Sequence, residues 1–484
     1  MASHAVKVQD LMHQIVAAAA VVLAAGKGTR MKSRRPKVLH EIAGKPLVSW
    51  SIDAVRGAGC SDVVVVVGHG AEDVVNVLSR RHDGMPRAVR TVLQAEQNGT
   101  GHAVMMALPT LPDVGVVVVV CGDTPRITAA AIAALMQARG SAPMALWTTQ
   151  MSEPRGYGRI VRDAEGNILG IVEEKDATAA QRTITEVNPG VYAFDIAFLR
   201  NTLPRLTTQN AAAELYLTDL VRLCVESGQQ VASLLVDVGL TPGINDRVQL
   251  ADAEDWARSE VQRRLLLGGV TLRNRATTTI EADVVCAEDV VIEQGVSLRG
   301  TTRLGRNVVV GQGAVLTDTV VADDVVIHPY SVCDRAVVGA GAVVGPFARL
   351  RPEADVGEGA HVGNFVELKK TRLGKGSKAN HLAYLGDADI GDGVNVGAGT
   401  ITCNYDGIGK HKTTLGDGVF VGSNATLVAP LVIGKDAYIA AGSVVTDGVP
   451  DDAVAFGRAR QVNKEGRAAV VRNNNAIRAG KKRS

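Results

Sequence analysis

Aromatic residues are scarce in this chain of 484 residues, at only 3%. A core with so few rings is typical of thin, regular β layers filled by Val, Ala, Ile and Leu. The six cysteines are scattered, with no close pairs that could form a disulfide framework or a structural zinc site. Isolated thiols of this kind predict a cytoplasmic protein.

Neither sign of charge dominates, because 52 basic residues face 50 acidic ones and the formal net charge is +2. We therefore expect neither nucleic acid nor a membrane surface as partner. No hydrophobic run is long enough to span a bilayer. The apolar segment Ile15–Ala25 could be mistaken for a signal peptide, but it lacks a basic flank and runs into a glycine loop, so we interpret it as a buried strand.

The length predicts two domains, since one ordinary core rarely extends over so many residues. We expect a first domain over residues 1–247 and a helical linker over 248–267. A second domain should cover 268–461. The basic segment 462–484 is then expected to be a flexible, solvated tail rather than a binding arm.

Short aliphatic runs alternate with helix-compatible stretches in the first half. The runs are Ile15–Ala24, Val63–Gly68, Val116–Cys121 and Met144–Thr149, and the stretches include Pro46–Gly57 and Ala129–Arg139. Strands that are apolar on both faces predict a mostly parallel sheet covered by helices. Ligands of such sheets bind beyond the carboxyl ends of the strands, which makes the loops Ala25–Met31 and Gly122–Pro125 functional candidates.

Beyond residue 267 aliphatic residues recur at every sixth position. The three series are Ile292, Leu298, Leu304, Val310, Leu316; Val338, Val344, Leu350, Val356, Val362, Leu368; and Leu415, Val421, Leu427, Ile433, Ile439, Val445. This period predicts a parallel β-helix whose repeated aliphatic points inward. The alternative, a glycine-rich β-sandwich, would require three long registers to arise by accident. Between Val396 and Leu415 the register is interrupted, so we expect Gly397–Thr414 to form a polar loop outside the coil.

A glycine loop with cations follows the first apolar run. Gly26 and Gly28 would let backbone N–H groups approach a phosphate closely, while Arg30 and Lys37 would neutralise a triphosphate and the developing pyrophosphate. Asp123 ends another apolar run and suits Mg²⁺, although a simple turn residue is the alternative.

Together with the segments 94–103 and 156–160, this loop resembles the sugar-1-phosphate nucleotidyltransferases of the uridylyltransferase branch. The resemblance implies a Rossmann-like α/β domain, Mg²⁺ held by Asp123 and Asn245, and direct attack of a sugar phosphate on UTP. It implies catalytic roles for Arg30 and Lys37. The implied UTP and UDP-N-acetylglucosamine contacts are Leu23, Ala24, Ala25, Gly26, Lys37, Gln94, Gly99, Thr100, Gly158, Glu173, Asn188 and Asn245. Cys121 departs from the family, which usually has an aromatic residue there.

Polar residues within the repeats are informative because most of a β-helix is scaffold. Arg351 and Lys369 could hold a phosphate, and His381 could take a proton from an attacking amine near neutral pH. A lone loop histidine is usually structural, but here it stands among other polar residues, including Tyr384 and the segment 404–406.

The segments 365–370, 380–387 and 397–407 resemble the glucosamine-1-phosphate acetyltransferase half of the bacterial bifunctional enzyme, and the whole resemblance covers residues 21–461. It implies a left-handed parallel β-helix of hexapeptide repeats, a homotrimer with acetyltransferase sites between subunits, and His381 as general base. The implied sugar-phosphate contacts are Arg351, Lys369, Tyr384 and Asn395, and the implied acetyl-CoA contacts are Asn404, Tyr405, Lys410, Ser423, Ala441 and Arg458. We expect no metal in this half, because His328, His361 and His381 lack a ligand spacing.

The family's function would be to make UDP-N-acetylglucosamine, the precursor of peptidoglycan and lipopolysaccharide, from glucosamine 1-phosphate, acetyl-CoA and UTP by way of N-acetylglucosamine 1-phosphate. Two alternatives remain. A nucleotidyltransferase could use the β-helix only to oligomerise, but Lys369, His381 and Tyr384 argue against a mere scaffold. A non-catalytic protein that binds sugar nucleotides is opposed by the intact set Arg30, Lys37, Asp123 and Asn245.

Overall fold

The structure is a computed structural model that describes residues 18–82, 89–113 and 115–480. The chain divides between Val261 and Gln262 into two compact units, and the division falls inside helix α8 (Arg247–Leu267). Among the described residues, no helix is both long enough and apolar enough to cross a bilayer.

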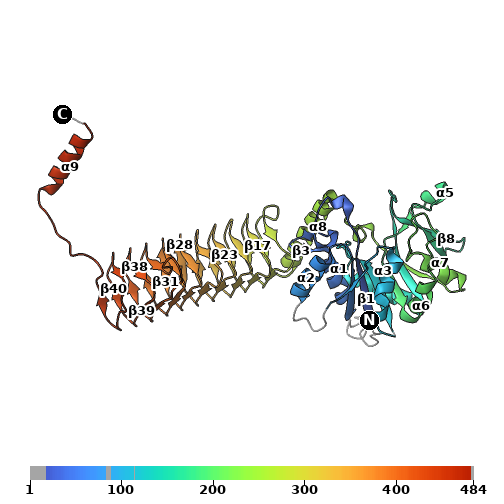
Figure 1. Cartoon of the computed structure of the whole chain (residues 1–484), viewed down its shortest axis with the longest axis horizontal. Coiled ribbons are helices and arrows are strands. Elements are labelled where there is room, and N and C mark those ends of the chain that lie inside the picture. The colour runs from blue at the N-terminus through green and yellow to red at the C-terminus, as the bar shows by residue number, and fades with distance from the viewer. Residues whose placement is uncertain (1–17, 83–88, 114, 481–484) are drawn as a thin grey trace, which may run out of the picture. The chain divides into compact units, whose positions relative to one another are not determined.

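A mixed sheet forms the centre of the first unit (Figure 1). Its strand order is β5-β4-β1-β6-β11-β7-β10-β8-β9, with β12 paired to β7. The strands are β1 (Ala18–Ala24), β4 (Asp62–Val67), β5 (Arg90–Leu93), β6 (Val116–Cys121), β7 (Met144–Gln150), β8 (Gly158–Arg162), β9 (Ile168–Val172), β10 (Glu186–Asn188), β11 (Tyr192–Asp195) and β12 (Ala232–Leu235). Residues 15–17 of the first expected strand lie outside the described residues.

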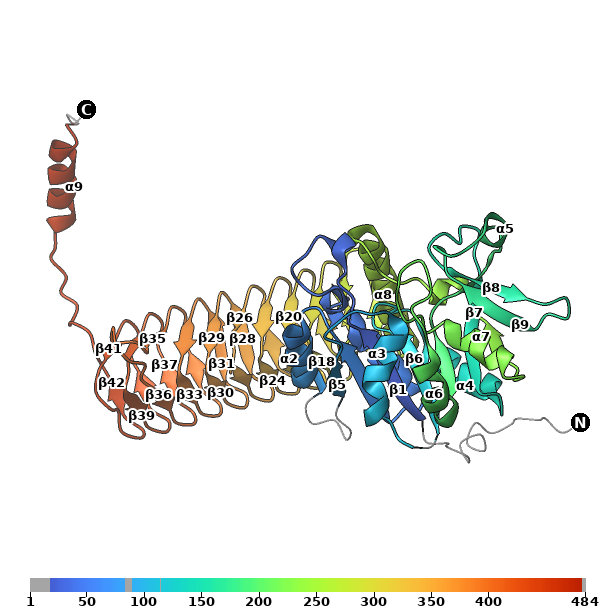
Figure 2. The same cartoon turned by 45° about the vertical axis from the view of Figure 1, so that its right-hand side comes forward.

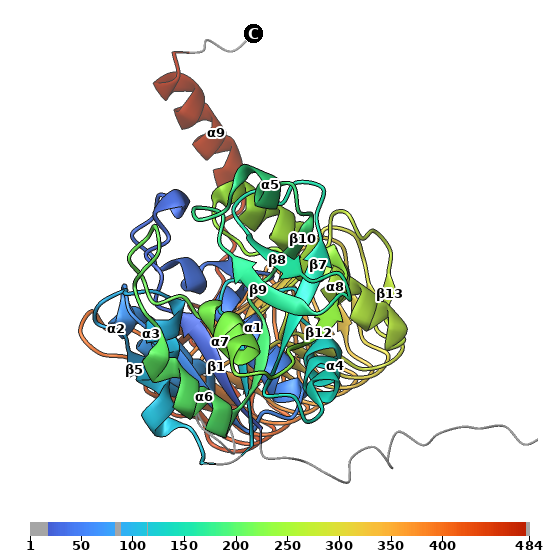
Figure 3. The ribbon, with the colours of Figure 1, turned by 90° about the vertical axis from the view of Figure 1, so that its right-hand side faces the viewer.

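The expectation of a mostly parallel sheet holds only for one half of it. Strands β5, β4, β1 and β6 are parallel, whereas β11 is antiparallel to β6 and β7, and β10, β8 and β9 also pair antiparallel. Figure 3 shows the latter strands gathered at the end of the sheet away from β5. The short connection between β8 and β9 reverses the chain direction without a crossover helix.

Helices cover both faces because the central strands are apolar on both sides. Ala18, Ala20 and Val22 pack with α1 (Leu47–Gly57), α2 (Ala71–His82) and α4 (Ala129–Arg139). The alternate residues Ala19 and Val21 pack toward the opposite layer, whose helices are α3 (Thr100–Ala107), α6 (Ile196–Thr202) and α7 (Asp219–Glu226). The two-residue period of the strand therefore separates the two core layers.

The second unit is a parallel β-helix of short strands (Figure 2). Its three sheets hold eleven strands from β13 (Thr271–Leu272) to β42 (Val454–Ala455), ten from β14 (Thr279–Ile280) to β41 (Val444–Val445), and nine from β15 (Val285–Cys286) to β39 (Leu431–Ile433). All seventeen aliphatic residues of the three six-residue series are buried, at 5% exposure or less. The repeat pattern thus identified the inner face of the coil correctly.

One coil contains 17 or 18 residues, as in the pairing of Val291 with Val309 and of Val309 with Val326. A coil of 17 has one residue fewer at a corner, which explains why the six-residue register shifts after Leu316. The series in fact continues through Val321, which is buried.

The expectation that Gly397–Thr414 lies outside the coil was wrong for both ends of the segment. Strand β35 (Ile401–Cys403) pairs with neighbouring strands on both sides, and Thr413 and Thr414 belong to β36 (Thr413–Leu415), so only the residues between these two strands form an inserted loop. The sequence pattern was misleading because the inward position is occupied by Thr402 instead of an aliphatic residue. Its hydroxyl accepts from Gly386 N at 2.7 Å and donates to Gly386 O at 3.1 Å, so this buried polar group has hydrogen-bond partners.

Helix α9 (Arg467–Arg478) lies in the segment that we expected to be a flexible tail. None of its residues is buried. Its alanines and arginines are good helix formers, which provides a local reason for the helix in the absence of packing.

Candidate active sites

A cavity of about 240 Å³ opens where β1 and β6 end. Nine residues that the sequence analysis singled out for nucleotide, metal or catalytic roles line it together: Leu23, Ala24, Ala25, Gly26, Lys37, Gln94, Gly99, Thr100 and Asp123. This is the carboxyl edge of the parallel half of the sheet, where ligands of such sheets bind.

Lys37 forms the charged centre of this cavity. Its Nζ atom donates to Oδ2 of Asp123 and, at 3.2 Å, to Oδ1 of Asn245. Asn245 Nδ2 donates to Gly243 O at 3.3 Å, which turns the amide oxygen toward Lys37. The backbone joins the two segments as well, because Ile244 N donates to Asp123 O at 2.9 Å. The structure therefore brings together residues 208 positions apart in the chain.

The donor set at this point fits a hard divalent cation. Two oxygen atoms, one from the carboxylate of Asp123 and one from the amide of Asn245, converge on the same positive centre. Mg²⁺ prefers such oxygen ligands and completes its shell with water and phosphate oxygens.

Two glycines are required by close approaches at the cavity. Gly28 has φ +58°, and a Cβ there would meet Cβ of Lys37 at 2.6 Å. Gly99 has φ +102°, and its Cβ would lie 2.5 Å from the carbonyl of Leu215. Both combine a positive φ, which side chains rarely adopt, with a lack of space. Arg30 is exposed in the short helix Thr29–Met31 and does not line the cavity.

Gln94 lines the same cavity and is only 3% exposed. Its Nε2 donates to Gly99 O at 3.1 Å, so the amide oxygen remains available to a ligand. An amide held in one orientation can read the edge of a nucleobase.

Three expected sugar contacts come together: Gly158 on β8, Glu173 directly after β9, and Asn188 on β10. Asn188 is the cross-strand partner of Gly158. A Cβ at Gly158 would lie 3.5 Å from both carboxylate oxygens of Glu173 and 2.7 Å from a methyl of Ile171, so this position has no room for a side chain. Burial raises the pKa of Glu173, and Thr218 Oγ1 donates to its carboxylate at 3.0 Å.

Cys121 contributes a neutral thiol to the nucleotide cavity. Burial raises its pKa to about 12, and the carboxylate of Asp123 adds to the shift. The Lys37 ammonium opposes this shift only in part, so the thiol stays protonated and is a poor nucleophile.

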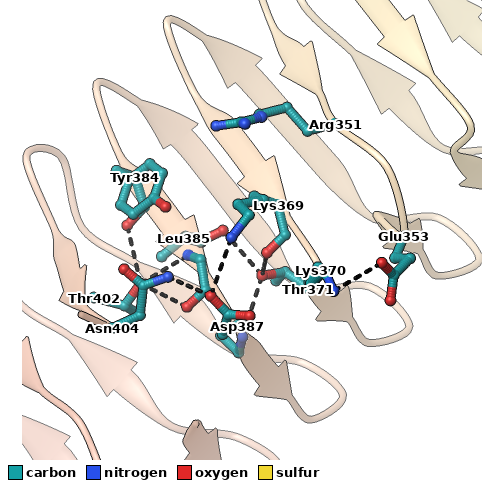
Figure 4. A network of polar contacts seen from close by, with 12 residues as sticks. Arg351, Glu353, Lys369, Lys370, Thr371, Tyr384, Leu385, Asp387, Thr402 and Asn404 are labelled. Carbon is teal, nitrogen blue, oxygen red and sulfur yellow. Dashed lines mark hydrogen bonds and ion pairs between the residues drawn. The ribbon is translucent and has the colours of Figure 1, made fainter. Parts of the chain in front are cut away.

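Arg351, Lys369 and Tyr384 lie on one side of the β-helix (Figure 4). They come from successive coils, in or just after β26 (Arg349–Leu350), β29 (Glu367–Lys369) and β32 (Tyr384–Gly386). Arg351 donates to Glu367 at 2.9 Å, and Lys369 donates to Asp387 at 3.5 Å. Asn404, which is 6% exposed, donates to the same oxygen of Asp387.

Lys410 joins this group from the inserted loop. The Lys369 ammonium lowers the pKa of Lys410, which places the two cations next to each other. Two adjacent ammonium groups with Arg351 nearby form a site for an anion. Lys410, an expected acetyl-CoA contact, therefore adjoins the expected sugar-phosphate contact Lys369.

His381 stands at a corner of the coil, exposed to solvent. Its Nδ1 lies 2.9 Å from Oδ1 of Asn364. Because an amide oxygen only accepts, Nδ1 must carry the hydrogen, and Nε2 is left with a free lone pair.

The acetyl-CoA candidates continue along the same corner. Backbone hydrogen bonds connect successive corners: Gly399 N donates to His381 O, Asn424 N to Ala398 O, and Gly442 N to Ser423 O. Ser423 and Ala441 therefore stack below His381 in successive coils. Arg458 lies beside this column, since a Cβ at Gly442 would be 3.9 Å from its Cδ. Tyr405 is 59% exposed on the inserted loop.

Asn395 lies on a different side of the coil. Its strand, β34 (Asn395–Val396), belongs to the sheet that starts with β13, whereas Lys369 and Tyr384 belong to the sheet that starts with β14. A single chain therefore does not gather all four expected sugar-phosphate contacts.

Both halves match known proteins. Residues 20–186 match the model of the MobA-like NTP transferase domain, and residues 412–447 match the bacterial transferase hexapeptide model of six repeats. The "Bifunctional protein GlmU" of Sorangium cellulosum is 52% identical over 457 residues, which is 94% of this chain and 96% of that protein. The protein of the same name from Trichlorobacter lovleyi is 46% identical over 94% of this chain and 99% of its own length. The chain belongs to the GlmU family.

Several side chains around these candidate sites were not found in the sequence analysis. Glu214 and Gln97 line the nucleotide cavity, Thr218 binds Glu173, and Asn364 binds His381. Glu214 and Thr218 lie in a segment without a motif, which reaches the cavity only through long-range contacts such as Gly101 N to Leu215 O at 2.8 Å. Asn364 could have been found, because it precedes His381 by 17 residues, the length of one coil.

Proposed function

We propose that this GlmU protein makes UDP-N-acetylglucosamine in two steps. The domain over residues 268–461 transfers an acetyl group from acetyl-CoA to glucosamine 1-phosphate. The domain over residues 1–247 then couples N-acetylglucosamine 1-phosphate to UTP and releases pyrophosphate. The convergence of Asp123, Asn245 and Lys37 at the nucleotide cavity supports the second step.

In uridylyl transfer the chain's own residues position the substrates and neutralise the charge of the phosphates. Gln94 faces the uracil edge, the backbone of Ala24–Gly26 lines the phosphate path, and Lys37 compensates negative charge at the α-phosphate. Asp123 and Asn245 would hold Mg²⁺, which when bound shields the phosphate oxygens. The sugar phosphate oxygen attacks the α-phosphorus, the bond to the β-phosphate oxygen breaks, and pyrophosphate leaves.

In acetyl transfer the free Nε2 of His381 acts as general base. The amine of glucosamine 1-phosphate attacks the thioester carbonyl while Nε2 takes the amine proton. The C–N bond forms, the C–S bond breaks, and coenzyme A leaves as a thiolate that takes up the proton held by Nε2. Arg351, Lys369 and Lys410 would hold the sugar phosphate, and the corner of Ser423 and Ala441 would receive acetyl-CoA.

We propose that the acetyltransferase site is completed by a second copy within a homotrimer. The separate location of Asn395 supports this, because one chain cannot direct all four contacts at one ligand.

An exposed apolar corner supports the same assembly. Tyr330, Phe347, Phe365 and Leu382, here called the corner ladder, occupy four successive coils and are between 46% and 62% exposed. Adjacent rings stack with centroids 5.3 and 5.4 Å apart. The ladder ends next to His381, so a second copy that covers it would also meet the active site.

A cytoplasmic location fits the cysteines, all six of which are free among the described residues.

Product analysis tests the function: the enzyme is incubated with glucosamine 1-phosphate, acetyl-CoA, UTP and Mg²⁺, and each component is omitted in turn. We expect UDP-N-acetylglucosamine and pyrophosphate only from the full mixture, whereas free thiol should also appear when UTP or Mg²⁺ is omitted. Nucleotide sugar formed from N-acetylglucosamine 1-phosphate without any acetyl transfer would reduce the β-helix to a scaffold. Removal of Mg²⁺ by EDTA should stop uridylyl transfer and leave thiol release unchanged.

A further inference from the structure

The expected sugar contact Asn188 has a buried partner that neither motif nor resemblance assigns. Asn188 Nδ2 donates to the hydroxyl of Tyr192 at 2.7 Å, and Gly190 N donates to Asn188 Oδ1 at 3.1 Å. Asn188 is 8% exposed and Tyr192 is 4% exposed. The carboxamide is therefore held at both ends by groups that water hardly reaches.

These two contacts determine the orientation of the amide. A backbone N–H can only donate, so the atom that faces Gly190 must be the oxygen, and the nitrogen must face Tyr192. Reversing the amide would place two donors against each other at Gly190. One hydrogen of Nδ2 is then bound to the phenol, and the second remains for another acceptor.

The sheet fixes the position of Tyr192. It pairs with Val119 on β6 and with Leu146 on β7, and its ring stacks on Phe194 with centroids 5.6 Å apart. Its hydroxyl accepts from Asn188, so the phenol hydrogen is also left for an acceptor. Burial raises the pKa of Tyr192 well above its usual value, and the carboxylate of Glu173 adds to this shift, so the phenol stays protonated.

The remaining hydrogens adjoin the expected sugar pocket. Asn188 lies directly across from Gly158, and a Cβ at Gly158 would be 3.5 Å from both carboxylate oxygens of Glu173, so the amide and this carboxylate belong to the same part of the sheet. This wall thus combines an oriented amide N–H, a phenol O–H and a carboxylate. Such a set suits a sugar that carries both hydroxyl donors and a carbonyl acceptor, as an acetamido sugar does.

We propose that Tyr192 is a positioning residue that makes the uridylyltransferase site selective for N-acetylglucosamine 1-phosphate by fixing the carboxamide of Asn188. This inference rests on the proposed uridylyl transfer. Without the phenol oxygen, a hydrogen of Nδ2 loses its acceptor in a buried place, and the amide is free to rotate. The loss concerns the sugar and not the nucleotide, since neither Asn188 nor Tyr192 lines the nucleotide cavity.

The test is Tyr192→Phe in the full-length enzyme, which keeps the ring and removes only the hydroxyl. We expect KM for N-acetylglucosamine 1-phosphate to rise about 5- to 10-fold, as for the loss of one buried hydrogen-bond partner, with KM for UTP unchanged. Discrimination against glucose 1-phosphate, measured as a ratio of kcat/KM values, should fall by a similar factor. The unchanged KM for UTP serves as the internal control of folding, because UTP binds in the same domain.

Two further variants separate positioning from stability. Phe194→Leu weakens the same core next to Tyr192 without touching Asn188, so it should lower Tm but leave sugar discrimination intact. In the double variant Asn188→Ala/Tyr192→Phe, the loss should equal that of Asn188→Ala alone, because the phenol acts through the amide.

The inference is overturned if Tyr192→Phe leaves KM and discrimination within twofold of wild type, if Phe194→Leu reproduces its effect, or if the two losses add in the double variant. A wild-type enzyme that forms no nucleotide sugar would instead refute the proposed function.

Discussion

The Nδ1 atom of His381 lies 2.9 Å from Oδ1 of Asn364, which occupies the same corner one coil earlier. The β-helix makes this contact possible, because residues 17 positions apart become neighbours on adjacent strands. Asn364 thereby selects the imidazole form whose Nε2 can accept a proton. The proposed general base thus depends on a residue outside the motif that contains it.

Asn364→Ala should lower kcat of acetyl transfer about 5- to 10-fold, since one hydrogen bond that holds the ring and its tautomer is lost. Uridylyl transfer should not change. Separate assays of thiol release and pyrophosphate release measure the two effects.

Asn364→Asp is the matched variant, because it keeps the size of the side chain and adds a negative charge beside His381. A carboxylate at this place would stabilise the protonated imidazole by charge attraction. The acid limb of the pH–rate profile for acetyl transfer should therefore move to higher pH. If the profile stays where it is in both variants, Asn364 does not act through His381.

Phe347→Asn tests the corner ladder. Phe347 has φ +55°, a conformation that costs a bulky residue about 1 kcal/mol, and Asn424 occupies the same position in a later coil with φ +56°. The substitution should therefore relieve strain within one chain while removing apolar contact between chains. We expect sedimentation to show loss of the trimer, with acetyl transfer lost and uridylyl transfer kept.

Phe347→Leu provides the control for this variant, because it keeps an apolar side chain and should remain trimeric. A Phe347→Asn protein that is still a trimer and acetylates at the wild-type rate would contradict a role of the corner ladder in assembly.

Thr402→Val tests the hydroxyl inside the coil. Valine has the same shape, but it leaves the buried N–H and C=O of Gly386 without the hydroxyl partner. Unfolding of the second unit should become easier by about 1–3 kcal/mol, measured by urea denaturation. An unchanged midpoint would mean that another group satisfies Gly386.

Cys121 should react very slowly with iodoacetamide at pH 8. With its pKa raised to about 12 by burial, on the order of one thiol in 10,000 is ionised at this pH. The rate should increase about tenfold for each pH unit as the thiolate becomes more abundant. Mass spectrometry of tryptic peptides measures the labelling, and complete modification within minutes at pH 8 would contradict the account.

The inner face of the β-helix could be predicted from the sequence, because a period of apolar residues determines it. Residues such as Val344 and Leu427 could be assigned to the inner face because a β-helix repeats one requirement in every coil. Thr402 was missed because its burial depends on partners in the previous coil, which no local pattern reveals. The antiparallel half of the first sheet was missed for a similar reason, since pairing partners such as Tyr192 and Val119 lie 73 residues apart.

The site residues also divide into those that a local pattern reveals and those that depend on distant partners. Those within a local motif, such as Gly26 and Lys37, were found by their pattern and line one cavity. Tyr192 and Thr218 became visible only in the structure, because each acts on a site residue from another strand or segment.

The most direct test of the central claim, two independent active sites on one chain, is a comparison of Asp123→Ala and His381→Ala in both half-reactions. Asp123→Ala should abolish pyrophosphate release and keep acetyl transfer. His381→Ala should abolish acetyl transfer and keep uridylyl transfer to N-acetylglucosamine 1-phosphate. If either variant, folded and assembled like the wild type, lost both activities, the two sites would not be independent and the account would be contradicted.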